Sequence, residues 1–341
     1  MGLPESARLL ADLVAVPSPT RHEADAARML ADRLPRFGWS GSHLDGAGSV
    51  VAERGTGDKE LVLLSHIDTV PGGPEVIINE QVIRGRGSVD AKGPCCAMAV
   101  AGGAVPVPEG WRITFVAAVG EEIDSKGARF RMPLHSPEAC VIGEPTGSDG
   151  VAISYRGRIL FDIKGEDDGA HRSGSPGPIT DSVMAASSII DITRNMGKGY
   201  SVAIMEMEGH EAGKRSASIT MDLRTPLGAD QEDLELMIRE TSAAFGVRSE
   251  IIEYVPPYGV HKSDPVIRAF RNAIRDCGGT PRVLAKQGTC DFNVLSPWGC
   301  HMGAYGPGNS IYDHSSNEQI PVSEYLKGLE VLKLALPRIM A

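Results

Sequence analysis

Short apolar runs, each followed closely by acidic residues or histidine, recur along this chain and limit the folds open to it. The runs 61–65, 111–119 and 139–142 are mostly continuous rather than alternating, which is typical of strands buried on both faces of a parallel sheet. Between them lie stretches with the apolar spacing of helices, such as the Ala-rich segment 91–105. Strands that alternate with helices predict an α/β fold whose mostly parallel sheet is covered by helices.

The pattern changes in the middle of the chain. The predicted elements there are a strand at 158–164, a helix at 179–195, strands at 200–207 and 216–222, a helix at 229–245 and a strand at 248–254. This β-α-β-β-α-β order is that of a ferredoxin-like domain, and its alternating strands indicate a sheet with one face in solvent or against a partner. We therefore expect a main domain of residues 1–156 and 258–341, interrupted by an inserted domain of residues 157–257.

Composition and charge exclude several classes of protein. Hydrophobic residues make up 42% and charged residues 23%, as in soluble globular proteins. The apolar runs are too short to cross a bilayer and the N-terminus lacks a secretory signal, so we expect a cytoplasmic protein without a membrane partner. A net charge of −10 without a basic cluster argues against a nucleic-acid partner. The six cysteines form no CxxC pair, which favours free thiols.

Two polar motifs flank the first predicted buried elements: one follows a strand and the other precedes a helix. His66 and Asp68 (LLSHIDTVP) end the first run, and residues i and i+2 of an extended chain point the same way. Asp68 can therefore hold the far ring nitrogen of His66 and fix its tautomer for a metal, or it can simply cap the strand end. Asp90 (GRGSVDAKG) precedes a predicted helix, where it can cap the helix or bridge two cations.

Three further motifs follow later strands. Glu121 and Glu122 come after the run 111–119, and adjacent buried carboxylates raise each other's pKa unless a cation or a proton lies between them. Glu144 (VIGEPT) follows the next strand, and His314 (DHSSNE) lies in a Gly- and Pro-rich loop. Ligand sites of open α/β sheets gather at the carboxyl ends of strands. Imidazoles and carboxylates without thiolates suit zinc, manganese or cobalt, and a shared aspartate makes a two-metal site.

Taken in order, the motifs HxD, GxxD, EExxSxG, GEPT and the late His in DHSxNE resemble those of the co-catalytic zinc aminoacylase and carboxypeptidase family. That family includes acetylornithine deacetylase and succinyl-diaminopimelate desuccinylase. The resemblance covers essentially the whole chain, and the segments 287–293 (QGTCDFN) and 305–318 are most similar to hydrolases that release lysine or ornithine from an amino-group carrier protein. It implies a zinc-exopeptidase-like catalytic domain, an inserted lid and dimerisation domain, and a homodimer.

The resemblance also implies which residues hold the metals. His66 and Glu144 resemble the ligands of one Zn²⁺, Glu122 and His314 those of a second, and Asp90 the bridge between them. Co²⁺ or Mn²⁺ are alternative metals. The peptide bond after Asp90 is expected to be cis.

Other family positions carry catalytic or substrate-binding roles. Glu121 resembles the general base, and Asp68 the partner of His66. His171 (GEDDGAHRSG) stands where the family has a histidine that stabilises the oxyanion, often across a dimer; an exposed loop imidazole is the alternative. Arg224 (MDLRTP) matches a residue that binds the substrate carboxylate, although a sheet-surface arginine would look the same. Gly288 and Thr289 match a loop of the family that lines the same pocket as this arginine.

The chain departs from the family pattern at a few positions. The Asn that many relatives carry some thirteen residues before the arginine is missing, and the segment 209–213 stands there. Cys290 occupies a position where relatives often have Ser. Cys95 and Cys96 replace small residues of a helix, and we expect them to be core thiols rather than ligands.

The sequence thus predicts a di-zinc hydrolase of a linear amide bond that releases lysine or ornithine from a carrier protein or an N-acyl derivative, in lysine or arginine biosynthesis. The alternatives are acetylornithine deacetylase, succinyl-diaminopimelate desuccinylase, a general N-acyl-amino-acid hydrolase or a dipeptidase. A metal-binding protein without catalysis would lack the base, yet Glu121 is present. The net charge of −10 opposes docking of an acidic carrier unless a local basic surface exists.

Overall fold

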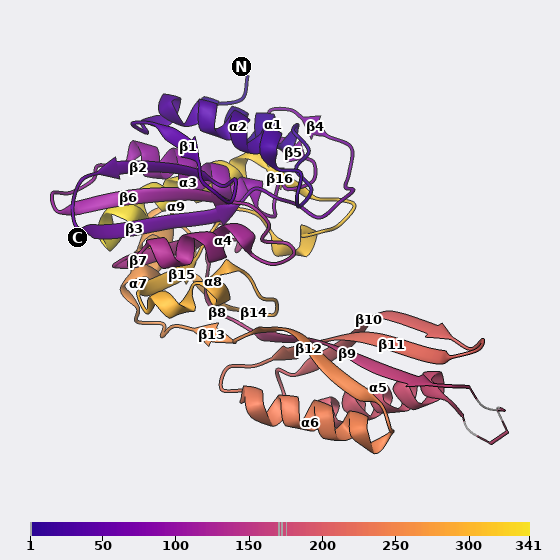
Figure 1. Ribbon diagram of the computed structural model, residues 1–341. Helices are drawn as coiled ribbons and strands as arrows, with labels where there is room; N and C mark the ends of the chain where they lie inside the picture. The colour runs from indigo at the N-terminus through magenta and orange to yellow at the C-terminus, as the bar shows by residue number, and fades with distance from the viewer. Residues whose placement is uncertain (1, 170, 172, 175) are drawn as a thin grey trace. The chain divides into compact units, whose positions relative to one another are not determined.

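The computed structural model describes residues 2–169, 171, 173–174 and 176–341, which form two compact units (Figure 1). Unit 1 comprises Met1–Ile153, Val260–Ala285 and Cys290–Ala341, and unit 2 comprises Ser154–Gly259 and Lys286–Thr289. The expected inserted domain, residues 157–257, lies within unit 2. Unit 2 also takes the segment 286–289, which the sequence placed in the main domain.

A mixed sheet forms the centre of unit 1. Its strands follow the order β1 (Ser42–Leu44), β2 (Val50–Gly55), β6 (Trp111–Ala118), β3 (Lys59–His66), β7 (Ala139–Gly143) and β15 (His301–Ala304). The neighbours β6, β3, β7 and β15 run parallel, whereas β1 and β2 are antiparallel additions at one edge. The predicted parallel sheet is therefore confirmed for its central strands.

Two strands connect the sheet to unit 2. β8 (Gly150–Tyr155) pairs antiparallel with β15 through Ala152 and Ala304. β13 (Tyr258–Gly259) pairs antiparallel with the last two residues of β8. β14 (Arg282–Lys286) pairs with β8 as well. Neither β8 nor β13 was predicted from the sequence.

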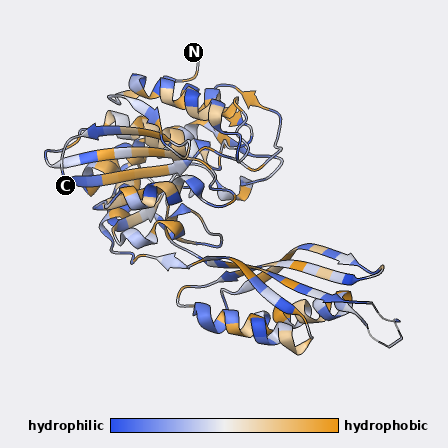
Figure 2. Cartoon of the chain, viewed as in Figure 1, coloured by the Kyte–Doolittle hydropathy of each residue, from blue (hydrophilic) through white to orange (hydrophobic). Residues whose placement is uncertain are grey.

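Helices cover this sheet because its central strands are apolar on both faces, as their hydropathy shows (Figure 2). The helices are α1 (Glu5–Val14), α2 (Ala24–Arg33), α3 (Lys92–Ala104), α4 (Lys126–Arg131), α7 (Pro265–Asp276), α8 (Asp291–Val294) and α9 (Val322–Ile339). The Ala-rich α3 is buried along almost its whole length and packs against β3, β6 and β7. A small antiparallel sheet of β16 (Gln319–Pro321), β5 (Val82–Arg84) and β4 (Ile77–Ile78) lies beside α1 and α9.

Unit 2 has the predicted β-α-β-β-α-β order. Its elements are β9 (Gly157–Asp167), α5 (Pro178–Asn195), β10 (Ser201–His210), β11 (Arg215–Thr225), α6 (Gln231–Ala244) and β12 (Arg248–Val255). The strands form an antiparallel sheet in the order β10-β11-β9-β12. Alternate residues Ile159, Phe161 and Ile163 of β9 are fully buried in the core with residues of both helices, so one face of the sheet is covered.

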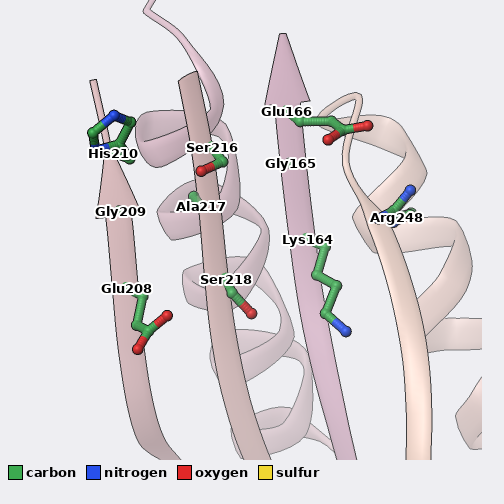
Figure 3. A pocket seen from close by; sticks show the side chains of 10 residues that line it. All are labelled: Lys164, Gly165, Glu166, Glu208, Gly209, His210, Ser216, Ala217, Ser218 and Arg248. Carbon is green, nitrogen blue, oxygen red and sulfur yellow. The ribbon is translucent and has the colours of Figure 1, made fainter. Parts of the chain in front are cut away.

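The opposite face of this sheet is polar. Lys164 and Glu166 of β9 lie on it, and Figure 3 shows helix behind the strands that carry them. A hollow of about 560 Å³ lies here, lined by Lys164, Gly165, Glu166, Glu208, Gly209, His210, Ser216, Ala217, Ser218 and Arg248. Charges of both signs surround it, and among the described residues its lining includes none of the predicted site residues.

Within the described ranges, every helix is too short or too polar to cross a lipid bilayer.

Candidate metal centre

The predicted ligands gather at one edge of the sheet of unit 1, where the parallel strands end. β3 ends at His66, which lies beside Ala118 at the end of β6. On the other side, Ser65 pairs with Gly143, the last residue of β7. Because neighbouring strands end at the same level, the acidic residues that follow β6 and β7 lie close to His66.

Asp90 lies between the two histidines. Its Oδ1 is 3.2 Å from Nε2 of His66, and its Oδ2 is 3.2 Å from Nε2 of His314. Nε2 of His314 is also 3.0 Å from Oε2 of Glu122. His66, Asp90 and Glu122 offer ligand atoms that all lie within 4.8 Å of one another. The Asp90–Ala91 peptide bond is cis, as expected. Each oxygen of one carboxylate thus faces a different imidazole.

Glu121 and Glu144 complete the surroundings of His66. Oε2 of Glu121 and Oε1 of Glu144 each lie 3.9 Å from Nε2 of His66. All three side chains are largely or fully buried, whereas His314 on its loop is 49% exposed. The structure therefore brings together the five predicted ligands and the predicted base.

Asp68 contacts more than His66. Its backbone carbonyl oxygen is 3.0 Å from Nδ1 of His66, closer than its Oδ1 at 3.6 Å. Its carboxylate instead accepts the backbone N–H groups of Glu121 at 3.0 Å and Glu122 at 3.1 Å, and the hydroxyl of Thr20 at 2.9 Å. We expected the carboxylate to hold the imidazole, but its oxygens lie closer to Thr20 and to the turn that carries the two glutamates than to the ring of His66.

That turn depends on a glycine. Gly120 has a φ of +77°, a conformation that residues with a Cβ atom seldom adopt. It lies two residues after the end of β6, and after it the backbone amides of Glu121 and Glu122 both donate to Asp68. The local sequence thereby aims two adjacent carboxylates into one site.

The charges of the site are unbalanced. Burial alone would lower the pKa of His66, but Asp68, Asp90 and Glu121 outweigh it and hold that pKa well above its usual range. Hydrogen bonds to Asp90 and Glu122 raise the pKa of His314 to about 10. Burial, aided by neighbouring carboxylates, raises the pKa of Glu121. The carboxylates thus stabilise positive charge at this position, and a divalent cation fits the nitrogen and oxygen donors.

The remaining predicted residues belong to unit 2. His171 is exposed, and its Nδ1 lies 2.7 Å from Oγ of Ser173. Arg224 of β11 donates to Asp222 at 2.8 Å and to Oγ1 of Thr289 at 3.2 Å, and Gly288 is exposed beside Thr289. The arginine and the loop that the resemblance placed in one pocket are therefore in contact.

The cysteines are not among the predicted metal ligands. All six are free thiols. Cys95 and Cys96 belong to α3 and are buried in the core of unit 1, and burial raises the pKa of the Cys95 thiol to about 12. A neutral buried thiol is a poor metal ligand, which agrees with their expected role in packing.

Three contact residues escaped the sequence analysis. Arg86 and Glu318 lie inside the motifs GRGSVDAKG and DHSSNE, yet only the histidine and aspartate of those motifs were assigned roles. Thr20 carried no signal beyond a helix-breaking VPSPT segment. Only the folded chain brings Glu318 to Asp90, Arg86 to Glu318 and His314, and Thr20 to Asp68.

The family model of peptidase family M20/M25/M40 matches residues 62–338. The chain belongs to this family. It is therefore a hydrolase that acts on an amide bond, and the ligand group at Asp90 agrees with the use of a metal. The resemblance noted in the sequence is confirmed.

Individual relatives extend over nearly the whole chain. A LysW-lysine hydrolase from Deinococcus radiodurans is 33% identical over 97% of this chain and 96% of its own length. A LysW-lysine/LysW-ornithine hydrolase from Saccharolobus islandicus is 28% identical over 97% and 95%. The structure of an M20 family metallo-carboxypeptidase from Sulfolobus solfataricus has a TM-score of 0.79 at 16% identity, covering 99% of this chain and 100% of that chain, and it shares the fold.

Proposed function

We propose that this protein is a di-zinc hydrolase that releases lysine or ornithine from an amino-group carrier protein or from a related N-acyl derivative. The observation that carries the two-metal part is Asp90, whose two oxygens each face a different histidine. The substrate class is supported by the names of relatives that match this chain from end to end. Such an activity would serve lysine or arginine biosynthesis.

The ligands divide into two sets around Asp90. His66 and Glu144 would hold one ion, His314 and Glu122 the other, and Asp90 would be shared. Zinc suits this set of imidazoles and carboxylates, with Co²⁺ or Mn²⁺ as alternatives. When bound, the two ions supply Lewis acidity that polarises an amide carbonyl and acidifies water.

Glu121 is assigned the role of general base. Its carboxylate takes a proton from the attacking water and delivers it to the nitrogen of the leaving amine. Two features support this role: burial raises the pKa of Glu121, which favours proton uptake, and the Asp68 carboxylate accepts its backbone N–H and so fixes its turn.

Arg224 is assigned to the α-carboxylate of the amino acid that leaves. An Nα-acylated amino acid keeps this carboxylate free, and a guanidinium binds it through paired hydrogen bonds. Contacts to Asp222 and Thr289 hold the arginine in place beside Gly288. This assignment would serve a dipeptidase equally well, so it does not select the substrate.

A homodimer formed through unit 2 is part of the proposal. β10 is an edge strand of ten residues, and an exposed edge of this length normally requires cover. Large apolar side chains are exposed on β10 and on α5 with its C-cap residue: Ile204, Met205, Met207, Val183, Met184, Ile192 and Met196. A second copy would bury the same residues from both chains across a two-fold axis.

His171 is proposed to stabilise the oxyanion, in its own chain or across the dimer. One such donor is worth about 3 kcal/mol, so His171→Ala should lower kcat by about 100-fold while zinc content stays unchanged. His43→Ala, which removes an exposed imidazole on the edge strand β1 of unit 1, is the control and should leave kcat unaltered. A His171→Ala enzyme with the kcat of wild type would remove the residue from the mechanism.

The substrate is tested by a hydrolysis screen of the zinc-loaded enzyme. We expect turnover of γ-glutamyl-linked lysine or ornithine, measured as released amine, with a higher kcat/KM than for acetyl-lysine, acetylornithine or succinyl-diaminopimelate. A preference for acetylornithine, for succinyl-diaminopimelate or for dipeptides would replace the substrate assignment by the corresponding alternative. Zinc binding without turnover of any of these would favour a metal-binding protein that lacks catalysis.

A further inference from the structure

Glu318 is a fully buried carboxylate next to the candidate metal centre. It directly precedes β16, and its side chain is 0% exposed. Its Oε1 accepts the backbone N–H groups of Val89 at 3.0 Å and of Asp90 at 3.1 Å. Its Oε2 accepts Nη1 of Arg86 at 2.6 Å. The carboxylate therefore binds the backbone of the bridging ligand rather than its side chain.

Arg86 extends the same contact to the second histidine. Its Nη2 donates to the backbone carbonyl oxygen of His314 at 3.2 Å, and its Nε donates to the carbonyl of Gly72 at 3.4 Å. His314 has a φ of +58°, in the left-handed region that residues with a Cβ atom seldom adopt. A loop in this conformation needs fixed partners, and the guanidinium is one of them.

The two residues lie on a common support. β5 and β16 pair antiparallel, with Gln319 opposite Arg84, so the segments that follow β5 and precede β16 start side by side. The backbone N–H of Gly85 also donates to the carbonyl oxygen of Glu318 at 3.2 Å. Arg86 and Glu318 thereby join the Asp90 segment to the His314 loop, although more than 200 residues separate the two in sequence.

We infer that the Arg86–Glu318 pair is a positioning device for the metal centre, which sets the spacing between the shared ligand Asp90 and the ligand His314. The inference rests on the proposed two-metal function. Asp90 and His314 come from different loops, and each would otherwise be free to move independently. A link through Glu318 and Arg86 holds both backbones at once, so an ion between them meets ligands that are already in place.

A buried ion pair can also serve stability alone, and this chain offers a matched control. Glu60, at the start of β3, is 1% exposed and accepts Nη2 of Arg112 at 3.2 Å and Oγ1 of Thr114 at 2.6 Å. It belongs to the same sheet as His66 but lies at the opposite end of the strand. Glu60→Gln therefore disturbs a buried carboxylate of unit 1 without touching the ligands.

The test measures zinc binding directly. Wild type, Glu318→Gln and Glu60→Gln are freed of metal with a chelator, titrated with Zn²⁺ by calorimetry at one pH, and unfolded with urea in parallel. We expect two sites in wild type, with one of them weakened by about 10- to 100-fold in Glu318→Gln, the usual effect of losing a partner that orients a ligand. Glu60→Gln should lose stability and keep both wild-type affinities.

The outcomes separate this inference from the function it rests on. Fewer than two zinc sites in wild type would overturn the two-metal proposal itself. Two sites of wild-type affinity in both wild type and Glu318→Gln would overturn the positioning role alone. If Glu318→Gln does not fold, Arg86→Lys takes its place, because lysine keeps the charge but loses the forked contact to Glu318 and His314. Arg86→Lys should weaken one site, and unchanged affinity at both sites would reject the role.

Discussion

Strand β3 has a buried ionic cluster at each end, and the two clusters differ in charge balance. At its start, Glu60 contacts His135 at 2.9 Å as well as Arg112 and Thr114, so its carboxylate is surrounded by donors. At its end, His66 is surrounded by carboxylates, among them Asp90. The first cluster is complete within the protein, and the second has an excess of acceptors.

The pKa values express this difference. Burial alone would raise the pKa of Glu60, but hydrogen bonds from His135, Thr114 and Arg112 hold it at about 2. At the other end, Asp90 and Glu122 raise the pKa of His314 to about 10. Where donors lower the pKa of a buried carboxylate, its charged form stabilises the fold. Where negative charge dominates, the site attracts protons or metal ions. Burial of charge alone therefore does not identify a functional site.

The largest effect is expected at the end of β3 where carboxylates are in excess, which we call the unbalanced end, when it loses the proposed base Glu121. Glu121→Gln should lower kcat by about 10²- to 10⁴-fold, because a positioned general base commonly contributes that much. Its unfolding free energy without metal should not fall, since the change removes one of several buried like charges. Steady-state kinetics with the zinc-loaded enzyme and urea unfolding of the metal-free protein measure the two quantities.

Zinc content shows whether Glu121→Gln loses activity because a base is missing or because a metal ligand is missing. Calorimetry should find wild-type zinc affinities in Glu121→Gln, because this residue is not among the proposed ligands. A variant that turns over at the wild-type rate with both ions bound would refute the role of Glu121. A variant that has lost zinc would show instead that Glu121 is a ligand.

The cluster around Glu60 at the start of β3, which we call the balanced end, should respond in the opposite sense: its loss changes stability and leaves kcat unaltered. Glu60 has a folded pKa of about 2, below its ordinary value of 4.5. A lowered carboxyl pKa stabilises the fold above pH 4.5, and this contribution is lost as the pH falls towards 2. The shift corresponds to about 3 kcal/mol. Glu60→Gln should therefore reduce the unfolding free energy by about this amount at pH 7.

The pH dependence distinguishes this effect from a general loss of packing. Urea unfolding of both metal-free proteins should show a gap that is full at pH 7, begins to close below pH 4.5 and is small near pH 2. Other carboxyl groups titrate in both proteins and cancel in the difference. A gap that stays constant over this range would show that Glu60 stabilises the fold by its shape rather than by its charge.

The sequence predicted the unbalanced end and missed the balanced one, for a physical reason. Site residues at strand ends follow apolar runs directly, so His66 and Glu121 stand out in the sequence. Glu60 begins such a run and looks like any solvated charge before a strand. Its partner His135 comes from a segment 75 residues away and reaches it only after the chain has folded. Long-range partners of a charge leave no periodic signal.

The fold divides in a similar way. Long elements with clear periodicity were predicted within a few residues, such as β3 (Lys59–His66) and α5 (Pro178–Asn195). The short strand β8 (Gly150–Tyr155) was missed, because it follows a Gly-rich turn and its pairing partners β15 and β13 come much later in the chain. Its strand conformation depends on those partners more than on local composition.

The smallest expected effect concerns Thr20, which supports the unbalanced end from outside the ligand set. Its hydroxyl donates to Oδ2 of Asp68 at 2.9 Å, and that oxygen also accepts the backbone N–H of Glu122 at 3.1 Å. Oδ1 of Asp68 accepts the N–H of Glu121 at 3.0 Å. Without the hydroxyl, the Asp68 carboxylate keeps both amides but gains freedom to rotate. The turn that carries Glu121 should then be held less firmly.

Thr20→Val removes the hydroxyl and keeps the shape of the side chain. One hydrogen bond contributes about 0.5–1.5 kcal/mol, so kcat should fall by about 2- to 10-fold, with KM for the amide substrate unchanged. Thr20→Ser keeps the donor and should retain wild-type kcat, which separates the hydrogen bond from the packing of the loop. If Thr20→Val and Thr20→Ser lose activity equally, the methyl group rather than the hydroxyl is what matters. If neither loses activity, the two amides suffice to orient Asp68, because a carboxylate that already accepts from both glutamate amides needs no third donor.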